Sequence, residues 1–240
     1  MQKKASTIAL LASGARLLFS SLWLRSTTSI YDHFAADYEE LFGSSQAAAS
    51  SQILDYVREQ SMRPKTAIDL GCGTGILTRA LADYVERVVG GDSSEEMLCR
   101  ARGTGGGGKI EYAKMNALRI GNLGQRYDMV TALGLLPHIP RDRFMDWVLE
   151  VHDVLTERGL LLIGIPAPPW RLLGVGASKA GHSRIDAILG ALANTAMSLF
   201  KVEVDFWYLN ERHIARSLTT AKLNFRIARR SGLKIIDIRR

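Results

Sequence analysis

The chain has 240 residues, a length that suits one α/β domain with an insertion. Hydrophobic residues make up 47% of it and charged residues 23%, which are ordinary values for a globular protein with a full core. Two cysteines argue against a disulfide framework and fit a reducing compartment such as the cytoplasm. The five histidines are scattered without partners at ligand spacing, so we expect no metal site. The net charge of +7 favours contact with anionic lipid or nucleic acid, although a solvated basic face explains it more often.

Residues 1–29 form a basic segment without an acidic residue. Its apolar and polar side chains would lie mostly on opposite faces of a helix, with Leu11, Ala15, Leu18 and Leu22 against Ser13, Arg16 and Ser20. The apolar run is too short and too polar for a membrane span. Three interpretations compete: an interfacial membrane helix, a cleaved transit peptide for a mitochondrion or other organelle, and a helix packed on the domain. The first two predict a protein that is peripheral to a membrane or imported into an organelle.

A helical pattern follows this segment. Tyr31, Phe34 and Tyr38 recur at helical spacing within the run YDHFAADY, which is typical of one helix face packed on a core. Residues 47–60 predict a second helix, and Pro64 closes it because proline cannot continue a helix.

The most informative stretch is residues 67–77, AIDLGCGTGIL, where a short apolar run containing Asp69 leads into three alternating glycines. This order predicts a strand, a tight turn and a helix, with glycine needed where a ligand lies directly on the backbone. The spacing of Gly71, Gly73 and Gly75 is G-x-G-x-G, which differs from the G-x-G-x-x-G of dinucleotide-binding loops.

A second apolar run, residues 88–92, ends in Asp92 at about the distance expected for a carboxylate that holds ribose hydroxyls. A predicted helix over 94–102 then ends in the glycine-rich stretch 103–108, which we expect to be a loop without a ligand role. Together the two runs resemble the class I S-adenosylmethionine-dependent methyltransferases, whose first motif is D-x-G-x-G-x-G. The resemblance covers roughly residues 31–240.

This resemblance implies an α/β, Rossmann-like doubly wound fold for residues 30–240. It implies a mainly parallel seven-stranded sheet with helices on both faces, and a helical cap over the substrate at 167–201, which includes Trp170. It also implies S-adenosylmethionine (SAM) as cofactor. The residues expected to hold the cofactor are Asp69, Gly71, Gly73, Gly75, Asp92, Ser93, Met97, Asn116, Ala117 and Leu133.

Two further segments carry the resemblance. The pattern Y-D-x-x-A-x-x-Y forms a lid over the cofactor in many small-molecule methyltransferases, which implies a lid role for Tyr31, Phe34 and Tyr38, although core packing explains them nearly as well. Asn116 and Ala117 lie where the family usually has Asp-Ala, and the Asn116 amide oxygen can accept a hydrogen bond from the adenine amino group.

The predicted strand over 127–133 leads into Leu135-Leu136-Pro137-His138. Enzymes that methylate nucleobase amines typically carry [D/N]-P-P-[Y/F/W] at this place, so we do not expect a nucleic-acid substrate. The apolar-Pro-His pattern is similar to that of small-molecule and quinone-type methyltransferases. Because its imidazole has an ordinary pKa near neutrality, His138 is the best candidate for a general base, and His33 is a weaker one.

In the remaining chain we expect a helix over 144–155, a turn at Gly159, a buried strand over 160–165, a strand over 202–209, a mostly helical stretch over 211–231 and a closing strand over 233–238. The family's closing strand normally has an antiparallel hairpin partner, which cannot be placed here unless 202–209 takes that position.

The expected function is transfer of a methyl group from SAM to an oxygen, nitrogen or carbon of a small, apolar or membrane-associated metabolite. The alternative is a methyltransferase-like scaffold or assembly factor that binds SAM without turnover. A membrane-surface contact would run through residues 1–29, and no oligomeric state is predicted.

Overall fold

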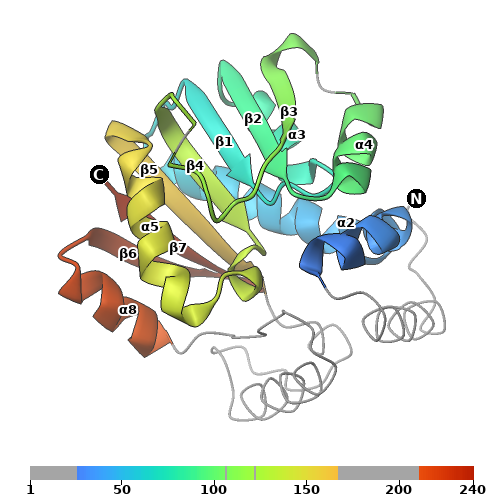
Figure 1. Ribbon diagram of the computed structural model, residues 1–240. Coiled ribbons are helices and arrows are strands. Elements are labelled where there is room, and N and C mark those ends of the chain that lie inside the picture. The colour runs from blue at the N-terminus through green and yellow to red at the C-terminus, as the bar shows by residue number, and fades with distance from the viewer. Residues whose placement is uncertain (1–25, 106, 122, 167–210) are drawn as a thin grey trace.

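Seven strands form one mixed sheet in the part of the chain that the computed structural model describes, residues 26–105, 107–121, 123–166 and 211–240 (Figure 1). The strands are ordered β3-β2-β1-β4-β5-β7-β6 across the sheet. Their bounds are β1 Thr66–Leu70, β2 Arg87–Asp92, β3 Ile110–Lys114, β4 Tyr127–Leu133, β5 Leu155–Pro166, β6 Asn224–Arg230 and β7 Leu233–Arg239. The helices are α2 Thr27–Glu59, α3 Ile76–Ala82, α4 Glu95–Gly103, α5 Phe144–Asp153 and α8 Glu211–Thr220, with 3₁₀ turns at Gly107–Lys109, Leu136–His138 and Arg141–Arg143.

Strands β1 to β5 are parallel, and β7 runs antiparallel to both of its neighbours, β5 and β6. The chain moves outward from β1 to β3 and then returns to place β4 on the other side of β1. The strand order therefore reverses between β1 and β4, which is where open α/β sheets bind their ligands. The expected doubly wound, mainly parallel sheet with helices on both faces is confirmed.

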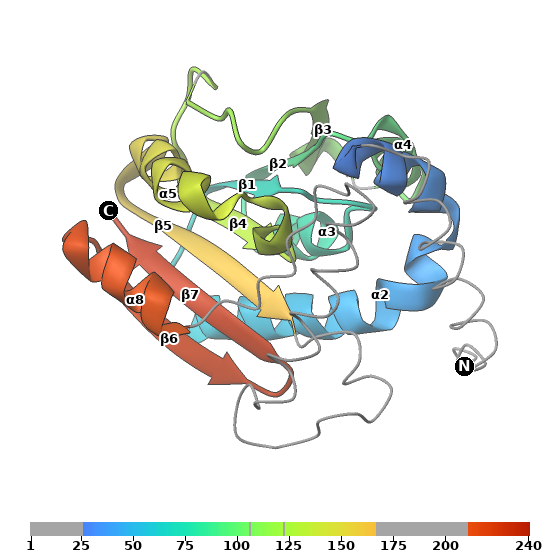
Figure 2. The same cartoon turned by 60° about the horizontal axis from the view of Figure 1, so that its bottom comes forward.

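The core lies on both faces of the sheet. In β5, Leu161 and Ile163 pack toward α5 and α8, whereas Leu160 and Leu162 pack toward α2 and α3. Figure 2 shows the two helix layers on opposite sides of the sheet. This two-sided burial explains why β5 is a continuous apolar run rather than an alternating one.

Helix α2 differs from the sequence-based prediction because it is a single helix of 33 residues that begins at Thr27, not at residue 47. Ser26 caps it by accepting the backbone N–H of Ser29, at 3.2 Å. Gly43 and the serines that follow it are weak helix formers, yet the helix continues through them. The expected boundary between residues 29 and 30 therefore lies within the first turn of α2.

The prediction of a helix through residue 231 is wrong. Helix α8 ends at Thr220, Lys222 has a positive φ of 56°, and residues 224–230 form β6. Arginine and alanine in this run are good helix formers, but pairing with β7 overrides that local preference. Strand β6 is the hairpin partner that the sequence alone could not place, and 202–209 lies outside the described residues.

Strand β5 also begins earlier than expected. Leu155 pairs with Tyr127 rather than ending α5, and the register then shifts so that Met129 pairs with Leu160. The four residues 156–159 of β5 thus lie opposite the single residue Asp128 of β4, which makes an irregularity within the strand. Gly159 lies inside this irregularity, where a Cβ would come within 3.0 Å of the Thr156 backbone, which fits the predicted tight change of chain direction before the buried strand.

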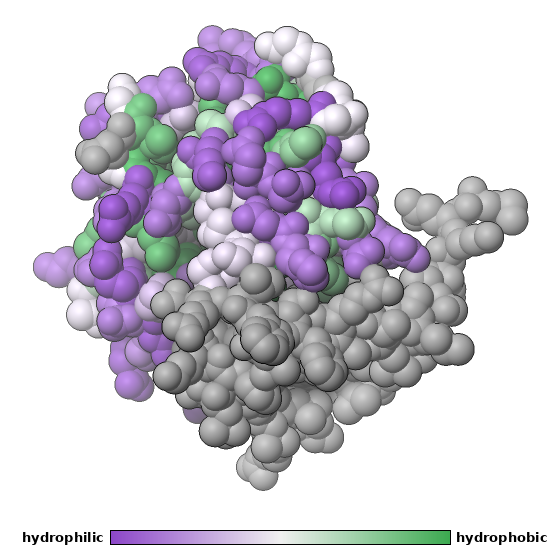
Figure 3. Space-filling view, turned by 45° about the vertical axis from the view of Figure 1, so that its right-hand side comes forward, coloured by the Kyte–Doolittle hydropathy of each residue, from purple (hydrophilic) through white to green (hydrophobic). Residues whose placement is uncertain are grey.

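The surface formed by the described residues is mainly polar. Among the described residues, Leu149 is the large apolar side chain that stands out as exposed, at 45%. Figure 3 shows hydrophilic side chains over most of the visible described surface, with hydrophobic ones only in small groups. None of the helices in the described ranges combines the length and the apolar run that a bilayer crossing needs.

Asp69 links β1 to α3 and β4 beneath the glycine loop. Its carboxylate accepts hydrogen bonds from the hydroxyls of Thr78 on α3, at 2.7 Å, and Thr131 on β4, at 2.8 Å. Asp69 and Thr131 are register partners in adjacent strands, which places their side chains together. The side chain is buried, and burial raises the pKa of Asp69 to about 6, against the effect of the two hydroxyl hydrogen bonds.

The pKa of Asp69 predicts a pH-dependent stability. Because its pKa is higher in the folded protein than in the unfolded chain, the protonated form favours folding, and ionisation between about pH 4 and pH 6 costs stability. A shift of this size corresponds to about 3 kcal/mol. We expect the free energy of unfolding of the wild type, minus that of Asp69→Asn, to fall by up to this amount as pH rises from 4 to 7 in urea titrations.

Asp128→Asn is the matched control. Burial acts to raise the pKa of Asp128, but hydrogen bonds from the backbone of Thr66 and Lys65 and from two threonine hydroxyls bring it below its ordinary value. The free energy of unfolding of the wild type, minus that of Asp128→Asn, should therefore change in the opposite direction and decrease as pH falls. Parallel pH curves for the wild type and Asp69→Asn would contradict the assignment of a buried, ionising Asp69.

Candidate functional site

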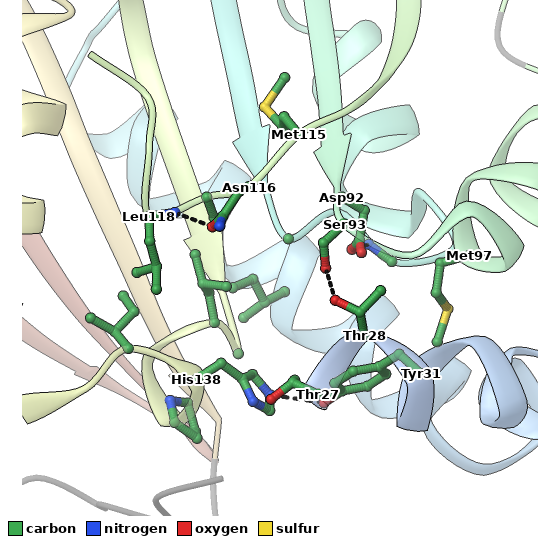
Figure 4. A pocket seen from close by; sticks show the side chains of 18 of the residues that line it. Thr27, Thr28, Tyr31, Asp92, Ser93, Met97, Met115, Asn116, Leu118 and His138 are labelled. Carbon is green, nitrogen blue, oxygen red and sulfur yellow. Dashed lines mark hydrogen bonds between the residues drawn. The ribbon is translucent and has the colours of Figure 1, made fainter. Parts of the chain in front are cut away.

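One large cavity lies at the carboxyl ends of β1, β2, β3 and β4, against the first turn of α2 (Figure 4). Its volume is about 1180 Å³. Its lining comes from residues 26–46 of α2 and its cap, the glycine loop, the ends of β2 and β3, and the stretch 133–142 after β4. The cavity therefore occupies the reversal point of the sheet, as expected for this class of fold.

The glycine loop forms the floor of the cavity. Gly71 and Gly73 line it with φ values of +69° and +54°. A Cβ on Gly73 would meet only Tyr38, at 3.9 Å, so the space above this backbone is open to a ligand. Gly75 has a different role: it caps α3, and a Cβ there would collide with the Tyr112 hydroxyl. Gly75 and the buried Asp69 shape the loop from below and do not line the cavity.

Asp92 joins the loop to the next helix. Its carboxylate accepts the backbone N–H of Gly73 at 2.8 Å and that of Ser94 at 2.9 Å. Burial raises the pKa of Asp92, and these two hydrogen bonds oppose the rise. A carboxylate has about four acceptor positions, so Asp92, which lines the cavity, can still accept hydrogen bonds from ligand hydroxyls.

The first turn of α2 lies against α4 across the cavity. The hydroxyls of Thr28 and Ser93 are 2.9 Å apart, as Figure 4 shows. Asp32 accepts the Ser94 hydroxyl at 2.5 Å and the backbone N–H of Glu96 at 3.4 Å. These contacts hold Ser26, Thr27 and Thr28 at the cavity wall. In the sequence-based prediction, these three residues belong to the separate segment 1–29.

The far wall combines thioether, amide and aliphatic side chains, namely Met97, Met115, Asn116, Ala117 and Leu118. The Asn116 amide oxygen accepts the backbone N–H of Leu118 at 2.9 Å. One of its two lone pairs is thus already used, and the second remains for the predicted bond to an adenine amino group.

The opposite wall follows β4 and is mainly apolar, with Leu133, Leu135, Pro137, Ile139 and Pro140, and it ends in the charged Arg141 and Asp142. His138 lies on this wall, and its Nε2 is 2.9 Å from the Tyr31 hydroxyl oxygen. Its Nδ1 is buried without a hydrogen-bond partner. Burial lowers the pKa of His138 to about 4, so the ring is neutral at neutral pH.

The predicted lid residues divide into two groups. Tyr31 and Tyr38 line the cavity, and the Tyr38 hydroxyl accepts a hydrogen bond from Gln46 at 3.1 Å. Burial raises the pKa of Tyr38 to about 12, so it stays protonated. Phe34 is buried and packs edge-on against Tyr38 and Phe42 rather than facing the cavity, so the core-packing interpretation fits it.

Two other predicted residues do not belong to the described site. His33 is exposed and does not line the cavity, and Trp170 lies outside the described residues. In the ranges that the structure describes, no group of three or more His, Cys, Asp or Glu is placed to hold a metal ion.

Sequence reasoning missed part of the lining. The residues not predicted are Ser26, Thr27, Thr28, Gln46, Met115, Leu118, Gly134, Leu135, Pro137, Ile139, Pro140, Arg141 and Asp142. Those at 134–142 flank His138 and could have been found from its position after a central strand. No sequence pattern indicated that Gln46 lines the cavity, because its position depends on the unexpected length of α2.

Comparisons with known proteins agree with this geometry. The family model described as "Methyltransferase domain" matches residues 67–159. A trans-aconitate 2-methyltransferase of Streptomyces avermitilis is 32% identical over 140 residues, which cover 53% of this chain and 50% of that protein. A ubiquinone biosynthesis O-methyltransferase of Bordetella avium is 36% identical over 93 residues, which cover 36% of this chain and 38% of that protein. The chain thus aligns with half or less of the length of these relatives.

Among solved structures, the DhpI–SAH complex has a TM-score of 0.67 at 20% identity, and the match covers 93% of this chain and 96% of that one. This likeness concerns the fold alone. The matched domain contains the glycine loop and Asp92, the residues that form the cavity floor and hold it in place. The sequence-based resemblance to the class I S-adenosylmethionine-dependent methyltransferases is therefore confirmed over the matched domain, residues 67–159.

Proposed function

We propose that this chain transfers a methyl group from SAM to a nucleophilic atom, in the first place an oxygen, of a small and largely apolar acceptor. The main support is the extent of the cavity, which reaches from Asp92 and Met97 to Pro137 and His138 without a dividing wall. Sites for one drug-sized ligand are usually about 300–1,000 Å³. At about 1180 Å³ this cavity has room for a cofactor and an acceptor side by side.

The cavity floor fits the cofactor. Bare backbone at Gly73 allows close approach, and the Asp92 carboxylate suits ribose hydroxyls. Met97 and Met115 offer polarisable side chains for an adenine ring. When bound, SAM supplies a methyl group that is already activated on a positively charged sulfur. The protein's task is then to align the acceptor and exclude water.

The wall after β4 favours an apolar acceptor, because Leu133, Leu135, Pro137 and Ile139 form most of it. The related ubiquinone biosynthesis protein is named an O-methyltransferase, which supports an oxygen as acceptor atom. Arg141 at the end of this wall favours a second candidate, a carboxylic acid, because a guanidinium group binds carboxylates well. The name of the trans-aconitate relative is in keeping with that second candidate.

The alternative is a scaffold that binds SAM without transferring its methyl group. A shaped cofactor floor supports binding in both cases, so the two proposals differ in what happens at the acceptor wall.

Asp92→Ala tests the cofactor site. It removes the acceptors of the Gly73 and Ser94 N–H groups and the expected ribose contacts. Hydrogen bonds to a charged group contribute about 1.5–3 kcal/mol, so we expect the affinity for S-adenosylhomocysteine (SAH) to fall about 10- to 100-fold in calorimetry. Asp55→Ala, which removes an exposed carboxylate on α2, is the control. Unchanged SAH affinity in a folded Asp92→Ala protein would refute the site assignment.

Methyl transfer itself is tested with labelled SAM and a panel of phenols and carboxylic acids. We expect labelled product from at least one phenol, with a mass increase of one methylene group. Gly73→Val provides the negative control, because its side chain would project into the cofactor space from a backbone of positive φ. SAH binding without product from any member of the panel would favour the scaffold.

We also propose that residues 1–29 contact a membrane surface. Residues 26–28 are the N-cap and the first helical residues of α2 and line the cavity, so the test deletes only residues 1–25. We expect the full chain to co-sediment with vesicles containing anionic phospholipid and the truncated chain to stay in the supernatant, because the deletion removes Lys3, Lys4, Arg16 and Arg25. Neutral vesicles are the control. Equal sedimentation of both chains would exclude these residues as the contact.

A further inference from the structure

We propose that Tyr31 is a catalytic residue of this methyl transfer, with its hydroxyl contacting the acceptor atom and passing the acceptor's proton to His138. The inference rests on the proposed function and assigns the proton transfer to a pair of residues. Tyr31 and His138 come from segments 107 residues apart, and both line the same cavity.

The geometry gives His138 one usable nitrogen. Nε2 is 2.9 Å from the Tyr31 hydroxyl oxygen, and the two rings meet edge-on with centroids 5.3 Å apart. Nδ1 is buried and has no partner, so it offers no path for a proton. An acceptor in the cavity therefore reaches the imidazole through Tyr31, which changes the expected role of His138 from a direct base to the second member of a relay.

The chemistry of the two groups sets the direction of the hydrogen bond. A phenol, with an ordinary pKa near 10, donates a proton far more readily than a neutral imidazole N–H, and an imidazole nitrogen is the better acceptor. The favoured arrangement has the Tyr31 hydroxyl donating to Nε2, with the ring hydrogen on Nδ1. A phenol oxygen that donates one hydrogen bond can also receive one from the hydroxyl group of the molecule to be methylated.

The position of Tyr31 is fixed by the first turns of α2. Thr28 contacts Ser93, and Asp32, the next residue after Tyr31, accepts the hydroxyl of Ser94. Figure 4 shows Tyr31 and Thr28 on the same stretch of α2, directed toward His138 and Ser93. The contacts that close α2 against α4 therefore also bring the Tyr31 hydroxyl to His138.

The step balances in atoms and charge. The O–H bond of the methyl acceptor breaks, and its hydrogen forms a new bond to the Tyr31 oxygen. The original Tyr31 hydrogen moves to Nε2 of His138. A carbon–oxygen bond forms as the carbon–sulfur bond of the cofactor breaks. The positive charge that disappears from sulfur appears on the imidazole, so the net charge of the cavity is unchanged. Because burial lowers the pKa of His138 to about 4, this proton leaves for solvent once the cavity opens, and neutral His138 is restored.

The tautomer of His138 is tested by nitrogen-15 NMR of histidine-labelled protein bound to SAH, with His138→Gln used to assign the signal. We expect hydrogen on Nδ1, a bare Nε2 that accepts a hydrogen bond, and a shift of the Nε2 resonance in Tyr31→Phe. His152→Gln controls for replacing a histidine outside the cavity. Hydrogen on Nε2 in the wild type would overturn the relay, since Nε2 could not then receive a proton.

Kinetics with the best acceptor of the panel test the catalytic role. General acid–base groups typically contribute at least about 100-fold. We expect Tyr31→Phe and His138→Gln each to lower kcat by about that factor with SAH affinity unchanged, and the double variant to be no slower than either single one, because a relay fails as a unit. Tyr84→Phe, which removes a hydroxyl bonded to the Met62 carbonyl, is the matched control.

The outcomes separate the two proposals. A wild type that binds SAH but methylates no acceptor overturns the proposed function and, with it, the relay. The relay alone is overturned if the wild type methylates an acceptor and Tyr31→Phe keeps the wild-type kcat. It is also overturned if the losses of kcat in the two single variants multiply in the double variant.

Discussion

The carboxylate of Asp92 is the interaction on which the cavity depends. It holds Gly73 in the loop and Ser94 at the start of α4, so one side chain fixes two of the surfaces that a ligand would meet. Asp69 acts from the other side of the loop, where it ties β1 to β4 and α3. The two acids resemble each other in the sequence, since each accompanies an apolar run. Burial separates them: Asp69 is part of the core, and Asp92 faces the cavity.

Helix α2 connects this cavity with the opposite part of the sheet. Near its start, Asp32 and Thr28 contact the α4 region, and near its end the Tyr56 hydroxyl donates to Asp237 on β7 at 2.8 Å. Figure 2 shows α2 extending from the β6/β7 edge toward α4. Arg239 pairs with the same Asp237 carboxylate at 2.9 Å, so a buried charge is compensated where the helix meets the sheet. The helix that carries Tyr31 is thus anchored at both ends.

The sequence predicts those parts of the structure that depend on local chemistry. The glycine loop requires positive φ at Gly71 and Gly73, and the apolar runs before it and before Asp92 require buried strands, so both are visible in one chain. The sequence does not predict β6, because its arginines favour a helix until β7 pairs with it. It also does not show that Asp69 turns into the core or that Gln46 reaches the cavity, since both depend on packing between distant segments.

The same contrast explains why the cofactor is easier to identify than the acceptor. The floor and far wall come from residues 71–118, which lie inside the matched methyltransferase domain. The proposed acceptor side combines the wall after β4 with Tyr31, and Tyr31 lies outside that domain on a helix whose course follows from tertiary contacts. His138 alone resembles a general base, but its accessible nitrogen already faces the Tyr31 hydroxyl. The reactive group that we propose at the acceptor is therefore a property of the pair, which only the folded chain brings together.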